Sequence, residues 1–221
     1  MIPISIDPQL KKIAPKLVLG VVSANVQFTK NSPQLWKEIE KRIKELRSTV
    51  TLASLYDIPQ IKALRDAYKA IGKDPTRYRG SQEALIRRIL QGKGLYQINT
   101  VVDINNLISL ETLHSVGSYD IDNLEPPIVF RIGKPGESYK GIGKETVNIA
   151  DLPVFADKAG PFGSPTSDSE RAMITLDTKK VMMIIISFTG QEHLKSQLQR
   201  ATNLLCGYAG ASKEKIEMTI I

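Results

Sequence analysis

Positive charge is concentrated in one short part of the 221-residue sequence. The segment from Lys62 to Lys93 carries nine Lys and Arg residues against three acids, so +6 of the net charge of +7 falls in 32 residues. Guanidinium and ammonium groups form charge-assisted hydrogen bonds to phosphates. A clustered basic surface is therefore typical of a protein that binds a polyanion such as nucleic acid, although a solvated helical surface would give the same composition.

The residues that common enzyme chemistries need are sparse. The two histidines, His114 and His193, have no Cys or His neighbour at metal-ligand spacing, so no structural zinc site is predicted. Segment 133–144 is rich in glycine but lacks the Gly-Lys-Ser/Thr ending of a phosphate-binding loop, which indicates a hairpin connection. Cys206 lies among leucines and is typical of an inert buried thiol. We therefore expect neither a metal nor an organic cofactor.

Apolar spacing predicts the elements of the first half. Segment 16–28 is β-branched and partly alternating, which predicts a strand. Amphipathic helices are predicted over 32–48, over 59–71 and from Ser81 onward. The last of these helices would direct Arg87 and Arg88 away from its apolar side. A short extended entry and a further helix are predicted over 101–113.

The second half changes to short β-rich runs separated by Gly, Pro or Asp, which is typical of an antiparallel or mixed sheet. The runs are IVFRI (128–132), ETVNI (145–149), PVFAD (153–157), AMITL (172–176) and VMMIIIS (181–187), followed by a helix over 190–206 and a strand over 214–221. The 181–187 run is apolar on both faces and predicts a central strand. Helical runs beside strand runs indicate an α+β fold. With no repeat or linker, a single domain over 1–221 is predicted, in which residues 1–75 form an N-terminal strand–helix–helix portion.

Composition limits the protein class. The sequence is 42% apolar and 24% charged, which is ordinary for a globular protein. It has no run of about 18 apolar residues and no secretory signal pattern at its start, so neither a membrane span nor export is expected. A single cysteine suits a reducing compartment. A cytoplasmic location is predicted.

Residues 78–124, YRGSQEALIRRILQGKGLYQINTVVDINNLISLETLHSVGSYDIDNL, resemble the B3/B4 domain of the phenylalanyl-tRNA synthetase beta subunit. The matching features are Ser81, the helix with Arg87 and Arg88, the stretch INTVVDINN, and YDIDNL after the interval that the synthetases also have. The resemblance is most specific over 78–137. It is closest to the free-standing B3/B4 proteins, which lack the other synthetase domains.

The resemblance implies a tRNA-associated module with an editing pocket that hydrolyses mischarged tyrosyl-tRNA. Together with the charge pattern it assigns phosphate contacts, and Tyr78 as a base-stacking side chain that would equally suit a core position. The predicted tRNA-binding residues are Arg77, Tyr78, Arg79, Arg87, Arg88 and Lys93. The predicted substrate-binding residues are Thr100, Asn105, Asn106 and Gly117, while Asp103 is expected to hydrogen-bond nearby backbone.

No catalytic residue is assigned. The resemblance places a pocket histidine where this chain has Gly117, and a pocket acid where it has Ile184. Ester hydrolysis can proceed with a water positioned by backbone groups and by Thr or Asn side chains. Segment 164–173 offers a different set of polar side chains, namely Asp168 and Glu170 with Arg171, close to Asp157 in sequence.

Three functions are compatible with these features. The first is binding of the aminoacylated end of tRNA, with hydrolysis of a wrong aminoacyl ester in trans to maintain translation fidelity. The second is a non-catalytic tRNA-binding or amino-acid-sensing module that has lost the editing chemistry. The third is a small-molecule binder with an incidental basic surface. The expected partner in the first two is tRNA, with no membrane involved.

Overall fold

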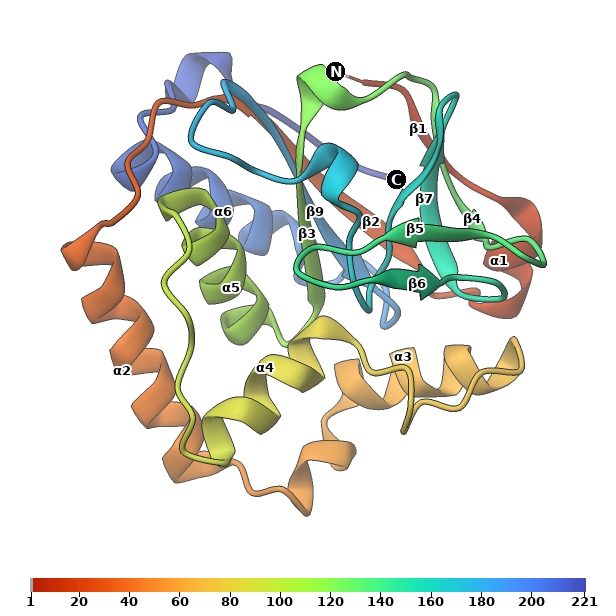
Figure 1. The fold of residues 1–221 in the computed structure, drawn as a ribbon. Coiled ribbons are helices and arrows are strands. Elements are labelled where there is room, and N and C mark those ends of the chain that lie inside the picture. The colour runs from red at the N-terminus through yellow and green to blue at the C-terminus, as the bar shows by residue number, and fades with distance from the viewer. Residues whose placement is uncertain (1) are drawn as a thin grey trace.

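Two four-stranded sheets enclose the main apolar core of the computed structural model, which describes residues 2–221 (Figure 1). The first sheet has the order β1-β4-β7-β8, with β1 parallel to β4 and the other pairs antiparallel. Its strands are β1 (Ile4–Ile6), β4 (Ile128–Ile132), β7 (Pro153–Asp157) and β8 (Gly160–Gly163). Between the sheets, Phe130, Phe155 and Phe162 pack against Tyr119 and Ile184.

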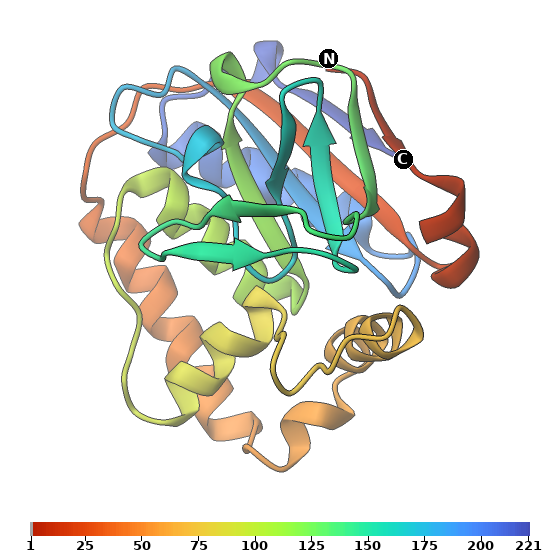
Figure 2. The same ribbon diagram turned by 45° about the vertical axis from the view of Figure 1, so that its right-hand side comes forward.

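The second sheet is antiparallel and has the order β10-β2-β9-β3. Its strands are β2 (Val18–Asn25), β3 (Ser115–Asp120), β9 (Lys180–Ser187) and β10 (Glu217–Ile220). Strand β9 has a neighbour on each side and is buried from Val181 to Ser187, which confirms the predicted central strand. A separate hairpin, β5 (Ser138–Lys140) and β6 (Thr146–Asn148), crosses over the strands (Figure 2).

Helices cover the other face of the second sheet (Figure 1). They are α2 (Pro33–Thr49), α5 (Thr100–Thr112) and α6 (Leu194–Tyr208). A second apolar cluster joins them to the sheet through residues such as Ile104, Val116 and Leu198. Because side chains alternate along a strand, odd-numbered positions of β3 face the first sheet and even-numbered positions face the helices.

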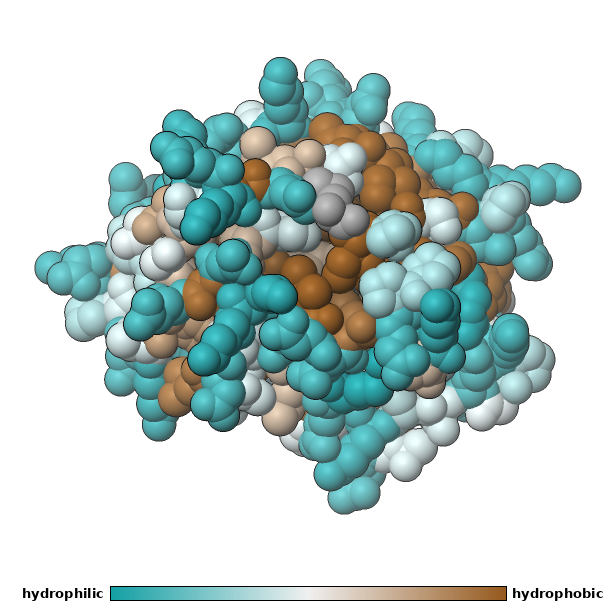
Figure 3. Space-filling view, turned by 90° about the horizontal axis from the view of Figure 1, so that it is seen from above, coloured by the Kyte–Doolittle hydropathy of each residue, from teal (hydrophilic) through white to brown (hydrophobic). Residues whose placement is uncertain are grey.

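The remaining helices are α1 (Pro8–Ile13), α3 (Pro59–Ala70), α4 (Ser81–Leu90) and the short 3-10 turn η1 (Ser54–Asp57). A third apolar cluster fixes α4 to α2, η1 and α5 through Leu46, Leu55, Ile86 and Leu110. Helices α3 and α4 both lie below the sheets in Figure 1. Figure 3 shows the opposite side, where apolar surface gathers near the middle of the face.

The α+β class and most of the predicted elements are confirmed. The predicted strand at 172–176 is wrong. Residues Glu170–Ala172 form a 3-10 turn (η3), in which the Ser169 hydroxyl accepts from Arg171 N, and a second turn follows in which Thr175 N donates to the Thr178 hydroxyl. The predicted extended entry at 101 is also wrong, since the Asn99 side chain accepts from Val102 N and starts α5 at Thr100.

Asp103 has the predicted backbone contact and a second partner that the sequence did not indicate. Its carboxylate is fully buried and accepts from Ile98 N at 3.3 Å and from the Trp36 indole Nε1 at 2.7 Å. Burial raises the pKa of Asp103, while the Trp36 and Ile98 donors oppose that rise. The carboxylate therefore joins α5 to α2 and to the segment before α5.

Asp103→Ala should lower the free energy of unfolding by about 2 kcal/mol, because it leaves the Trp36 and Ile98 donors without an acceptor. Urea unfolding followed by Trp36 fluorescence measures this. Asp177→Ala, at an exposed position, is the control and should change stability by less than about 0.5 kcal/mol. Equal stability of the two variants would contradict the assigned role of Asp103.

Candidate nucleic-acid interface

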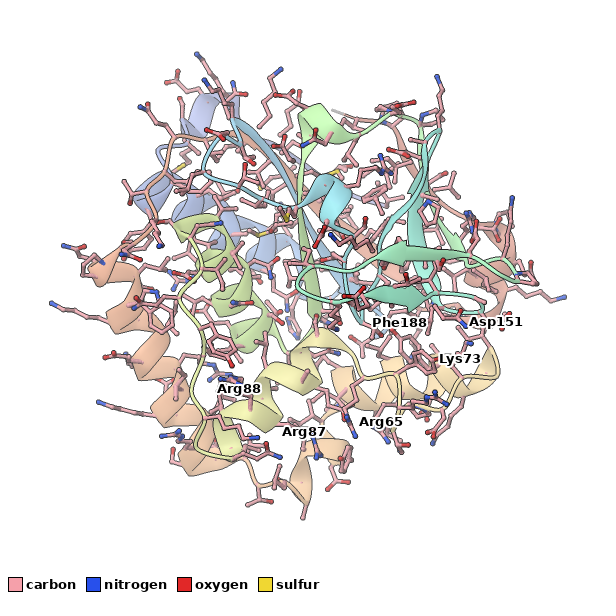
Figure 4. All side chains as sticks on the ribbon, in the orientation of Figure 1. Arg65, Lys73, Arg87, Arg88, Asp151 and Phe188 are labelled. Carbon is pink, nitrogen blue, oxygen red and sulfur yellow. The ribbon has the colours of Figure 1, made fainter. Side chains whose placement is uncertain are left out.

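Helix α4 directs two arginines to the surface. Its buried side carries Ile86 and Ile89, which leaves Arg87 and Arg88 half-buried on the other side, as the sequence predicted. The helix ends at Leu90, and Lys93 follows in an exposed loop. Figure 4 shows Arg65, Arg87 and Arg88 along the side of the molecule formed by α3 and α4.

Two tyrosines lie beside these arginines. The Arg88 guanidinium lies 4.0 Å from the centroid of the Tyr96 ring, and Tyr96 is 66% exposed. Arg87 donates to the Tyr56 hydroxyl at 2.5 Å, and the Arg65 guanidinium lies 4.6 Å from the centroid of the Tyr56 ring. We call Tyr56, Arg65, Arg87, Arg88 and Tyr96, together with Lys93, the cation–aromatic face.

Buried Glu83 neutralises part of the basic cluster. Its carboxylate contacts Arg65 at 3.1 Å and Arg79 at 3.7 Å. Lys73 pairs with Asp151 at 3.6 Å, so it too is partly compensated. Within residues 2–221, the predicted phosphate contacts without a carboxylate partner are Arg77, Arg87, Arg88 and Lys93.

Tyr78, the predicted base-stacking side chain, is half-buried and packs against the core between the sheets. Its ring faces Lys73, whose Nζ lies 5.1 Å from the ring centroid. Tyr56 and Tyr96 are the more available rings, and the sequence analysis missed them. They lie just before and just after the basic segment 62–93, Tyr56 in the 3-10 turn η1 and Tyr96 in the loop after α4, and this flanking position was the signal that could have found them.

The predicted substrate-binding residues do not lie in one place. The Thr100 hydroxyl is buried and donates to Thr29 O at 2.8 Å. Asn105 accepts from the Ser118 hydroxyl at 2.9 Å on the helix side of β3, and Asn106 is half-buried on α5. Gly117, by contrast, lies on the face of β3 directed at the first sheet.

Gly117 and Ile184 are directly opposite each other in the β3–β9 register. A Cβ added at Gly117 would lie 2.3 Å from the Tyr119 hydroxyl oxygen, and one added at Gly163 would lie at the same distance from it. The Tyr119 phenol therefore occupies the space beside both glycines. It is buried against Phe155 and Phe162, so this part of the core is filled.

Asp168 accepts the Tyr119 hydroxyl at 2.9 Å and the Ser164 N–H at 3.1 Å. Burial raises its pKa from 3.8 to about 6, although the two donors and Lys144 oppose the rise. Burial, together with the negative charge of Asp168, raises the pKa of Tyr119 well above its usual value. The pair therefore holds a carboxyl group that titrates close to neutral pH.

Segment 164–169 connects this pair to the helices. Pro165 O accepts from Ser81 N at the start of α4 at 2.7 Å and from the Ser115 hydroxyl at 3.0 Å. The Thr166 hydroxyl lies 2.7 Å from that of Tyr68 on α3. The segment thus places Asp168 on the side of the sheets from which α4 begins.

The other acids that the sequence placed near this segment have their own partners. Asp157 forms a bidentate ion pair with Arg171, with N–O distances of 2.8 and 3.0 Å. Glu170 pairs with Lys140 at 2.9 Å. These contacts fix loops, and they do not gather around Asp168.

The family model "B3/4 domain" matches residues 63–210, two thirds of the sequence. The chain belongs to the B3/4 domain family. No group of three or more His, Cys, Asp or Glu side chains in residues 2–221 is placed to hold a metal ion, and none of the described helices could cross a bilayer.

Related proteins of this family are phenylalanine–tRNA ligase beta subunits. That of Bifidobacterium longum is 31% identical over 106 residues, which cover 44% of this chain and 12% of that protein. That of Aquifex aeolicus is 27% identical over 129 residues, which cover 50% of this chain and 17% of that protein. The aligned part is thus less than a fifth of each relative.

A solved structure has the same fold. It is an N-terminal fragment of the phenylalanyl-tRNA synthetase beta subunit from Pyrococcus horikoshii, with a TM-score of 0.52 and 16% sequence identity. The match covers 97% of this chain and 50% of that fragment. Nearly all of the present chain therefore shares the fold of that fragment, beyond the part that the family model matches.

The filling of the core by Tyr119 predicts a non-additive pair of substitutions. Gly117→Ala should cost about 2 kcal/mol, because the new methyl group overlaps the phenol. In a Tyr119→Leu background the cost should fall by more than about 1 kcal/mol. Urea unfolding of the four proteins measures both values, and equal costs in the two backgrounds would show that the phenol does not occupy this space.

The raised pKa of Asp168 predicts a pH effect on stability. The folded pKa of about 6 exceeds the usual 3.8, so the stabilising protonated form is fully populated below about pH 4 and is lost as pH rises through 6. Asp168→Asn should therefore gain stability relative to the parent protein between pH 4 and 8, by up to about 3 kcal/mol. Exposed Asp177→Asn is the control. If the difference in unfolding free energy between Asp168→Asn and the parent protein did not change with pH, the burial of this charge would be contradicted.

Proposed function

We propose that this B3/4 protein binds tRNA and engages its single-stranded aminoacylated 3′ end. The observation that carries the proposal is the cation–aromatic face, where Arg88 stacks on Tyr96 and Arg87 contacts Tyr56. Unpaired bases stack on exposed aromatic rings, and arginines hold the adjoining phosphates without reading sequence. A solvated helical surface would not require tyrosines beside the arginines.

The relatives support the same substrate. They are tRNA ligases, and the family resemblance implies a module that contacts tRNA. Lys93 within the face, and Arg77 in the segment before α4, are further cations that lack carboxylate partners among the described residues. Arg79 is a weaker candidate for phosphate contact, because it already pairs with Glu83 at 3.7 Å.

Hydrolysis of a mischarged aminoacyl ester in trans is the second candidate, and Asp168 is the observation in its favour. A carboxylate with a pKa of about 6 is suited to take a proton from water near neutral pH. The hydrogen bond from Tyr119 holds its orientation, and segment 164–169 contacts the start of α4. Asp168 would then act as the general base in place of the pocket histidine and the pocket acid, which the resemblance puts at Gly117 and Ile184.

The filled space beside Gly117 supports the alternative, a tRNA-binding or amino-acid-sensing module without hydrolysis. An aminoacyl group could enter there only if the Tyr119 ring moved out. In that case Thr100 and Asn105 serve the helix side of the sheet, where their polar groups fix α5 to its neighbours, and Asn106 lies beside them on α5.

Replacing Arg87 and Arg88 together with Ala should weaken tRNA binding at low salt and flatten its salt dependence. Each lost phosphate contact should reduce the slope of log K against log salt by about 0.7 to 0.9. Fluorescence anisotropy with labelled tRNA, titrated at several salt concentrations, measures the slope.

The matched control is Lys213→Ala with Lys215→Ala, two exposed cations of the 3-10 turn η4 (Lys213–Lys215), which lies at the end of the molecule opposite α4 (Figure 1). It removes the same charge and should leave the slope close to that of the parent protein. If both double variants change the slope equally, binding depends on net charge alone and α4 is not the interface.

Deacylation of tRNAs charged with correct or near-cognate amino acids separates the two candidates. Accelerated loss of one mischarged species that Asp168→Asn abolishes, with tRNA binding retained, would establish the hydrolase. No acceleration for any species, with salt-dependent binding intact, would leave the binding module.

A further inference from the structure

A polar cavity of about 190 Å³ lies where the first turns of α3 and α6 approach the loop between α5 and β3. It is lined by Pro59, Gln60, His114, Thr189, Gly190, Glu192, His193, Leu194 and Gln197. Its volume equals that of about six water molecules in the liquid, which suits a ligand smaller than a drug-sized molecule. None of the residues assigned to the tRNA interface lines it.

Two helices begin at this cavity. Helix α3 has 12 residues and begins at Pro59, and α6 has 15 residues and begins at Leu194. Neither helix has a side-chain cap. Within residues 2–221, no acceptor is present for the first-turn N–H groups of Gln60, Ile61, Lys195 and Ser196. Free N–H groups at the positive ends of two helices favour an anion between them.

Two polar side chains at the cavity also lack partners. His114 is 95% buried, and its ring makes no hydrogen bond to the described residues. Burial lowers the pKa of His114 to about 4, so the neutral ring offers one donor and one acceptor at pH 7. The Gln197 Oε1 atom is buried without a partner, a state that costs free energy unless a ligand donates to it.

Glu192 limits the charge of the ligand. Its exposed side chain contributes a carboxylate to the lining, which accepts hydrogen bonds and disfavours a dianion. The lining thus combines N–H donors at two helix ends with acceptors on Gln197, Glu192 and His114. A ligand that satisfies both sets must carry an oxyanion and its own O–H or N–H donor.

We propose that this cavity binds a small oxyanion that retains a hydrogen-bond donor, with the oxyanion at the N-termini of α3 and α6 and the donor directed at Gln197. Dihydrogen phosphate and the anion of a small hydroxy acid are monoanions that share this chemistry. The site is separate from the cation–aromatic face, so it stands whether or not the protein binds tRNA.

Isothermal titration of the full chain with two matched pairs of small anions tests the proposal. Phosphate keeps an O–H at neutral pH and sulfate does not, and glycolate has a hydroxyl that acetate lacks. Within at least one pair, the donor-bearing anion should bind about tenfold more tightly. Preference in the phosphate pair assigns a phosphate-type ligand, and preference in the glycolate pair assigns a hydroxy acid.

Gln197→Met removes the unpaired acceptor at similar side-chain size and should weaken binding of the preferred anion by about tenfold. Gln199→Met is the matched control, since Gln199 lies on the same helix but bonds to Asn203 and does not line the cavity. Comparable thermal unfolding of both variants excludes a loss of fold. The proposal would be overturned by any one of three results. Sulfate and acetate could bind as tightly as phosphate and glycolate, none of the four anions could bind, or the two variants could have equal effects.

Discussion

The Tyr119 phenol sets the spacing of the two sheets at the point where β3, β8 and β9 meet. Only glycine fits at Gly117 and Gly163, because a Cβ at either position would overlap the hydroxyl. The ring packs edge-on against Phe162 at a centroid distance of 4.9 Å, and its hydroxyl donates to Asp168. The contact between the sheets and the position of segment 164–169 therefore depend on the same side chain.

Segment 164–169 carries this constraint to the surface. Its backbone accepts from the first N–H of α4, and a buried Glu83 within α4 holds Arg65 and Arg79 in place. Helix α4 is thereby fixed at its start, while its other end presents Arg87 and Arg88 beside two tyrosines. The cation–aromatic face thus stands on a rigid base, which would reduce the entropy lost on binding the proposed polyanion.

The fold class and the basic helix followed from local signals. Apolar spacing identified the helices, and the doubly apolar run at 181–187 identified the central strand. What the sequence could not provide was which side chains meet across the sheets. The use of Glu83 as a partner for two arginines, the separation of Asn105 from Gly117 by the β3 strand, and the contact of Tyr119 with Asp168 all join residues distant in sequence. The strand predicted at 172–176 failed because two side-chain hydroxyls favour turns at its ends, Ser169 by accepting from Arg171 N and Thr178 by accepting from Thr175 N.

Amide hydrogen exchange of the protein with and without tRNA tests most directly that the cation–aromatic face is the nucleic-acid interface. If it is, tRNA should protect amides newly in residues 52–57 and 81–99, with little change in β10 and at the start of α1. Protection confined to β10 or to the outer surface of the first sheet, or none at a tRNA concentration that saturates binding, would contradict it.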